Sequence, residues 1–196
     1  MKRLHQLGTV FAVALTLGLA SISAHAAPFD HQFIDSMTPH HESALVMAQM
    51  AVTKAKYPEV RALARGIVAD QKKEIAYMQT LHKRFYPNAK DMPGMGMGDM
   101  KMGGKMMMPG MMMGLPMKGM MDMGKLKNAK GAMFDKMFLE MMIPHHAGAI
   151  SMADEALKTS GRPEIRSLAA RIIDAQAKEI GVMHSIHDRH FGHIKG

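Results

Sequence analysis

Two segments of the chain carry the same metal-binding types of side chain at the same spacing. Each reads Met-x-Pro-His-His-x-x-Ala-x-x-Met, starting at Met37 in one segment and at Met142 in the other. Imidazole nitrogens suit copper in either oxidation state, and soft thioether sulfurs select Cu(I). The shared pattern therefore predicts metal binding, with copper as the first candidate.

A second motif follows each segment, in which glutamate, methionine and histidine recur every four residues from Glu74 and from Glu179. On a helix this spacing gives one stripe of side chains, about 6 Å apart along the axis. If the chain turns near Tyr57, antiparallel packing puts Glu74 opposite the paired histidines and Met78 opposite Met37. Two His/Met sites are predicted. Their ligands are Met37, His40, His41, Met78 and His82 in one site, and Met142, His145, His146, Met183 and His187 in the other, with Glu74 and Glu179 as ligands or as residues that orient a histidine.

Simpler interpretations stay open for some of these residues. The histidines of one segment could form a solvated face, or one could be buried against Glu74, but the joint repetition of all these residues disfavours this. Pro39 and Pro144 each either kink a helix or lie in its first turn. If a helix starts at Pro39, Thr38 would be its cap. Methionine also fills helical cores, which is the role expected for Met47, Met50 and Met152.

The motifs belong to an internal repeat. A shift of 105 residues aligns Phe29–Tyr86 with Phe134–Phe191 without a gap, and 24 of 58 positions are identical. Apolar residues recur at helical spacing in both copies, and no alternating strand pattern competes. Each copy is expected to form two helices, divided before Pro58 and before Pro163. Together the copies predict an all-α fold, a four-helix bundle of two duplicated hairpins.

A methionine-rich stretch lies between the copies. Residues 88–130 contain 15 of the 26 methionines, together with nine glycines and three prolines. This composition predicts neither helix nor strand, so we expect a long flexible crossover that collects metal. The methionines expected to capture it are Met106, Met107, Met108, Met111, Met112 and Met113.

The N-terminus has the pattern of a secretory signal peptide. Lys2 and Arg3 precede an apolar run over Val10–Ala20, and Ala24–Ala26 fits a cleavage site. An uncleaved anchor is the alternative. The expected organisation is a signal peptide at 1–26, a hairpin at 27–87, the linker at 88–130 and a second hairpin at 131–196, exported to the periplasm. No cysteine is available for a disulfide or thiolate site.

Charge and composition say less about partners. The net charge of +8 is spread along the chain, only 5% of residues are aromatic and no nucleic-acid-binding motif is present. We therefore expect no nucleic-acid partner and no stable membrane insertion after removal of the signal. The expected partners are a metal ion and another copper-handling protein.

Both halves resemble the domain-of-unknown-function 305 family. The resemblance rests on FxxxMxxHHxxAxxMA, at 33–48 and 138–153, and on KEIxxM, at 73–78 and 178–183. It covers nearly all of the chain after the signal except the methionine-rich stretch. It implies two tandem copies of the family sequence, a ferritin-like helical bundle as the fold, and an association with copper like that of periplasmic copper-tolerance proteins.

The function predicted from these features is capture of Cu(I), or of Cu(II) or Ag(I), for copper tolerance, buffering or delivery. A ferritin-like metal oxidase is one alternative. Its di-iron form requires Glu-x-x-His motifs, but Tyr77 and Val182 stand where those histidines would be. A mononuclear copper oxidase stays open, although we expect no enzyme. The other alternative is a helical partner-binding scaffold with incidental metal affinity.

Overall fold

The structure is a computed structural model that describes residues 26–89 and 123–194. Residues 1–25 of the predicted signal peptide and the predicted capture methionines, Met106–Met108 and Met111–Met113, lie outside the described residues. Within these two ranges the chain forms helices and no strand, so the all-α prediction is confirmed. No helix in the described part is both long enough and apolar enough to cross a membrane.

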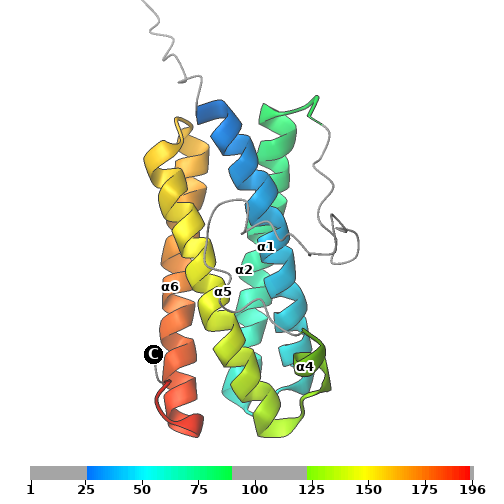
Figure 1. Ribbon diagram of the computed structural model, residues 1–196. Helices are drawn as coiled ribbons and strands as arrows, with labels where there is room; N and C mark the ends of the chain where they lie inside the picture. Colours follow the sequence, from blue (N-terminus) through cyan, green and yellow to red (C-terminus); the bar gives the residue numbers. More distant parts are fainter. Residues whose placement is uncertain (1–25, 90–122, 195–196) are drawn as a thin grey trace, which may run out of the picture.

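Four long helices and one short helix make up the described fold (Figure 1). They are α1 (Ala26–Lys54), α2 (Pro58–Phe85), α4 (Met123–Asn128), α5 (Gly131–Thr159) and α6 (Pro163–Phe191). Helix α1 packs against α2 and α5 packs against α6, each pair running antiparallel. The pairs meet chiefly through α1 and α5, with a lesser contact between α2 and α6.

The helix ends follow from local sequence. Pro58 and Pro163 open α2 and α6, where a missing N–H costs nothing. Glu59 and Glu164 lie in the first turns, at the positive ends of the two helix dipoles. Gly192 ends α6 with a φ of 81°, a backbone conformation that favours glycine.

Pro39 and Pro144 lie inside α1 and α5. The interpretation that a helix begins at these prolines is therefore wrong, as is the capping role for Thr38. The Thr38 hydroxyl instead donates to the Ile34 carbonyl oxygen over 2.8 Å. Each helix continues through its proline because residues on both sides are buried, as Met37 and His41 are in α1. Their burial offsets the one hydrogen bond that proline removes.

The end of the methionine-rich stretch is also ordered. Helix α4 covers Met123–Asn128, so the expectation that this stretch contains no helix is wrong here. Leu126 is fully buried and packs in the same core cluster as Phe134 and Phe138. The physical reason is local, since glycine and proline are absent after Gly124 and one large apolar side chain is available to bury.

Two buried aspartates tie each hairpin to the turn of the other. Asp135 of α5 accepts hydrogen bonds from the backbone N–H groups of Lys56 and Tyr57, over 2.8 and 2.7 Å. At the equivalent position, Asp30 of α1 lies 3.2 Å from Arg162 Nε, beyond the end of α5. Burial raises the pKa of Asp30, against the opposing effects of Ser160 and Arg162. These contacts therefore fix the position of each hairpin against the other along the axis of the bundle.

Substitution of Asp135 by alanine should destabilise the protein by roughly 2 kcal/mol or more, because two backbone N–H groups beside α2 lose a charged acceptor. Denaturant unfolding measures this change. The control is Asp154→Ala, which removes an exposed ion pair with Lys158 and should change stability by less than about 1 kcal/mol. Similar losses in the two variants would contradict the role assigned to Asp135.

Candidate metal centre

The two histidine pairs meet where α1 crosses α5. The ring centroids of His40 and His145 lie 3.8 Å apart, although one residue comes from each hairpin. His41 and His146 are the adjacent residues, with their rings 6.4 Å from those of His40 and His145 respectively. The centre thus belongs to both hairpins, whereas the sequence predicted a separate site within each.

A serine fixes the tautomer of one central histidine. Ser43 donates its single hydroxyl proton to the His40 carbonyl oxygen over 2.8 Å, and its oxygen lies 2.7 Å from His145 Nε2. The arrangement that pairs all three groups has His145 Nε2 donating its hydrogen to the Ser43 oxygen. In a neutral imidazole the remaining nitrogen, Nδ1, then carries the lone pair.

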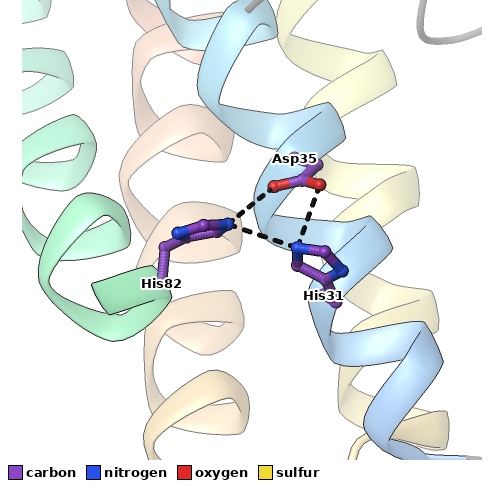
Figure 2. A group of neighbouring side chains, drawn as sticks. All are labelled: His31, Asp35 and His82. Atoms are coloured by element: carbon purple, nitrogen blue, oxygen red, sulfur yellow. Dashed lines mark hydrogen bonds and ion pairs between the residues drawn. The ribbon is translucent and has the colours of Figure 1, made fainter. Parts of the chain in front are cut away.

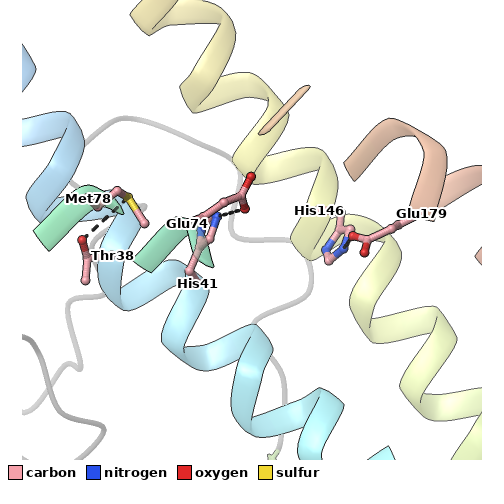
Figure 3. Close-up of polar contacts among 6 residues, drawn as sticks. All are labelled: Thr38, His41, Glu74, Met78, His146 and Glu179. Carbon is pink, nitrogen blue, oxygen red and sulfur yellow. Dashed lines mark hydrogen bonds and ion pairs between the residues drawn. The ribbon is translucent and has the colours of Figure 1, made fainter. Parts of the chain in front are cut away.

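Two glutamates act in the same way on the neighbouring histidines (Figure 3). His41 Nε2 lies 2.8 Å from Glu74 Oε2, and His146 Nε2 lies 2.7 Å from Glu179 Oε2. This is the pairing expected from the register of the hairpins. A carboxylate only accepts hydrogen bonds, so each Nε2 is the donor. Such carboxylate–histidine pairs commonly orient imidazoles that bind metals.

The Nδ1 atoms of all four histidines are buried and have no hydrogen-bond partner among the described residues. Buried polar atoms are normally paired, and leaving one unpaired costs about 1–3 kcal/mol. In three of the rings the hydrogen bonds made by Nε2 direct the lone pair to Nδ1. The arrangement therefore offers unprotonated nitrogens to a ligand that accepts electron pairs.

The two central histidines are held neutral. Burial lowers the pKa of His40 to about 3, with smaller contributions from His41 and His146. Burial also lowers the pKa of His145 well below its ordinary value, again aided by neighbouring imidazoles. Protons therefore compete weakly for these rings near neutral pH, so a metal ion has little proton competition to overcome.

The predicted methionines lie buried one helical turn away from these groups. Met37 precedes His40 by three residues on α1, and Met78 follows Glu74 by four on α2. Both methionines belong to one core cluster, whereas Met142 and Met183 belong to the other. Of these sulfurs, that of Met78 lies 3.7 Å from the Thr38 hydroxyl (Figure 3).

His82 and His187 lie elsewhere. His82 is eight residues beyond Glu74 on α2, roughly 12 Å along the helix axis, and contacts His31. The ring nitrogens of His187 contact the Gly192 carbonyl oxygen at 2.8 Å and Glu140 at 3.3 Å. The structure therefore does not bring these two histidines to the central pairs.

Sequence reasoning missed three polar residues near this level of the bundle. Ser43 has no counterpart in the repeat, where Gly148 takes its place. Gln71 and Gln176 fit the apolar stripe, yet they are buried glutamines with side-chain atoms that lack a partner among the described residues. Their equivalent positions, three residues before Glu74 and Glu179, were the available signal.

Fold and site together define an all-helical bundle with a buried histidine cluster at the junction of its two hairpins. The chain belongs to the DUF305 family, described as "Domain of unknown function (DUF305)", whose sequence profile matches residues 30–187. That single match spans both halves.

Solved structures of related proteins share the fold. CopM in its Cu(II)-bound form is 35% identical, with a TM-score of 0.66 over 82% of this chain and 96% of that chain. The Cu(I)-bound form is 33% identical, with a TM-score of 0.66 over 83% and 98%. A DUF305 fragment from Deinococcus radiodurans is 27% identical, with a TM-score of 0.66 over 84% and 98%.

One curated relative is similar to this chain over a shorter region. Uncharacterized protein L153 of Acanthamoeba polyphaga mimivirus is 44% identical over 54 residues, which are 28% of this chain and 36% of that protein. The chain therefore spans about a third of the length of this relative.

Metal-free protein should lose stability as the pH falls from about 6.5 towards 3. The pKa of His40 is about 3 in the folded protein against 6.5 for an ordinary histidine, so the unfolded chain binds more protons across this interval. The stabilising contribution is complete above pH 6.5 and declines below it. Denaturant midpoints at several pH values measure the loss. The variant His40→Gln/His145→Gln should lose less over the same interval, and an equal loss would contradict the neutral state of these rings.

Proposed function

We propose that this chain binds copper at the junction of α1 and α5, with His40 and His145 as the central ligands. The observation that carries the proposal is the set of four buried Nδ1 atoms without partners, on His40, His41, His145 and His146. The similarity to CopM, which has been solved with Cu(I), Cu(II) and silver, supports copper as the metal.

Cu(I) is the favoured state in this proposal. The four buried thioethers, of Met37, Met78, Met142 and Met183, supply soft ligands on the adjacent helical turns, and soft ligands select Cu(I). Ag(I) shares this preference, and the imidazoles also suit Cu(II). Glu74 and Glu179 orient His41 and His146 rather than bind the metal directly.

The methionine-rich stretch would collect copper and raise the amount bound. In this account residues 1–26 direct export to the periplasm, and residues 88–130 join hairpin repeats at 27–87 and 131–196. Met106–Met108 and Met111–Met113 are the densest run of thioethers in the collecting stretch. The bound copper serves buffering, tolerance or delivery to another copper-handling protein.

The two halves are proposed to be tandem copies that build one ferritin-like bundle. Support comes from contacts repeated at equivalent positions, such as His41 with Glu74 at 2.8 Å and His146 with Glu179 at 2.7 Å. The aspartates Asp30 and Asp135 also occupy equivalent positions and each reaches the opposite hairpin. We propose binding rather than catalysis, and sustained oxygen consumption with Cu(I) or Fe(II) would contradict that assignment.

Anaerobic Cu(I) titration against a competing chelator tests the site. A variant lacking residues 92–122 should bind fewer copper ions than the full chain but keep one tight equivalent. Adding His40→Gln/His145→Gln to that variant should weaken this equivalent at least ten-fold, about 1.4 kcal/mol. The matched control is His193→Gln, which changes an exposed histidine and should leave the affinity unchanged.

Retention of the tight equivalent after the double substitution would contradict the assignment. Loss of the tight equivalent on deletion alone would place the tight site in the methionine-rich stretch.

Replacement of Met37 and Met78 by leucine should lower the affinity for Cu(I) more than that for Cu(II), because leucine fills a similar volume but has no thioether. Parallel competition titrations, anaerobic for Cu(I) and aerobic for Cu(II), measure the ratio of the two affinities. Thermal unfolding of the metal-free variant controls for damage to the core. An unchanged ratio would mean that these sulfurs serve packing alone.

A further inference from the structure

A second group of ligand-type side chains lies at the open end of the first hairpin, away from its turn. Figure 2 shows His31 and Asp35 of α1 facing His82 of α2. His31 Nε2 lies 3.2 Å from His82 Nε2 and 3.2 Å from Asp35 Oδ2, and His82 Nε2 lies 3.5 Å from Asp35 Oδ1. Among the described residues, this is the one group of three such ligands whose atoms lie within 4.8 Å of each other.

The spacing of these atoms matches the coordination of a small divalent cation. Ligands about 2.0–2.2 Å from a tetrahedral metal centre are separated from one another by roughly 3.3 Å. The two Nε2 atoms lie 3.2 Å apart, and those of His31 and His82 lie 3.2 and 3.5 Å from different oxygens of Asp35, so each pair of side chains is close to that value. Two imidazole nitrogens and one carboxylate would occupy three positions and leave another for water.

Two long helices position the group. His31 and Asp35 are four residues apart on α1, so they share one face of the helix. His82 lies in the last turn of α2, where the negative end of the helix dipole favours a cation. The Tyr86 ring lies 4.4 Å from the His31 ring. The side chains of Asp35 and His82 are 12% and 10% exposed, while that of His31 is 27% exposed and gives access from solvent.

The second half of the chain provides an internal comparison. Lys136, Glu140 and His187 occupy the positions equivalent to His31, Asp35 and His82. There the Lys136 ammonium group lies 3.8 Å from Glu140, which also lies 3.3 Å from His187 Nε2. A positively charged side chain therefore lies beside the carboxylate in the second half. In the first half that cationic side chain is replaced by another ligand.

We propose that His31, Asp35 and His82 bind a divalent first-row transition-metal ion at a site separate from the His40–His145 centre. The ligand set contains no sulfur and combines imidazole with carboxylate, which suits Cu(II) and Zn(II) rather than Cu(I). Of these two ions, Cu(II) binds such ligands more tightly. The site belongs to the first half alone, since lysine takes the place of one ligand in the second.

Zn(II) is a suitable probe because thioethers are not among its usual ligands. Competition titrations with a zinc-binding chromophore would compare the full wild-type chain with His31→Lys, which copies the residue at position 136, and with Asp35→Asn. The wild type should bind one equivalent more tightly than about 10⁻⁵ M. Each variant that retains the wild-type helical melting transition should bind this equivalent at least ten-fold more weakly. Asp35→Asn keeps the size of the side chain and removes its charge, whereas His31→Lys replaces an imidazole with a positive charge. The two variants therefore test the site independently.

The variant His40→Gln/His145→Gln separates this site from the central one, and it should keep the zinc equivalent. A Cu(II)-loaded sample of this variant should show an electron paramagnetic resonance spectrum with coupling to two imidazole nitrogens, and His31→Lys in the same background should reduce that coupling. Three results would overturn the proposal: weak zinc binding by the wild type, full affinity in a folded His31→Lys or Asp35→Asn variant, or loss of the zinc equivalent in His40→Gln/His145→Gln.

Discussion

Burial of imidazole nitrogens where α1 meets α5 is the constraint on which the rest of the bundle depends. His40 and His145 come within 3.8 Å of each other, centroid to centroid, at the main contact between the hairpins. Four ring nitrogens are buried there without a partner among the described residues, and each costs about 1–3 kcal/mol. The flanking apolar clusters must offset this cost, and a bound metal would remove it.

Several features act together to keep those rings in place. The prolines lie within helices that continue on both sides, so each His-His pair lies within a long helix. Glu74, Glu179 and Ser43 hold the Nε2 atoms of three rings. Asp30 and Asp135 fix the hairpins against each other from opposite ends. A metal site at such a junction would couple binding to the packing of the two halves.

The near-symmetry of the fold makes its asymmetries informative. Ser43 of the first half contacts His145 of the second. Gly148 stands at the position equivalent to Ser43 in the second half. The open end of the first hairpin carries two histidines with an aspartate, whereas the second hairpin has a lysine and a glutamate beside its histidine. On the proposed assignments, soft ligands would lie near the centre of the bundle and nitrogen–oxygen ligands at one end.

Local signals made much of the fold predictable from sequence. Pro58 and Pro163 mark the starts of α2 and α6, and four-residue spacing with an antiparallel turn is sufficient to pair Glu74 with a histidine. The contact between His40 and His145 was not predictable, because it depends on how two hairpins pack over a long sequence separation. The group around His31 occurs in one half only, so the repeat carries no signal for it, and of its three members the sequence predicted only His82 as a ligand.

The central claim is that copper binds where α1 meets α5. Anomalous diffraction at the copper absorption edge, from crystals of the Cu(I)-loaded full chain grown without oxygen, tests it most directly. The account predicts a strong anomalous peak within about 2.0–2.3 Å of nitrogen atoms of His40 and His145, a normal range for bonds from nitrogen or sulfur to such a metal. Copper peaks confined to other residues, with both of these rings unliganded, would contradict it.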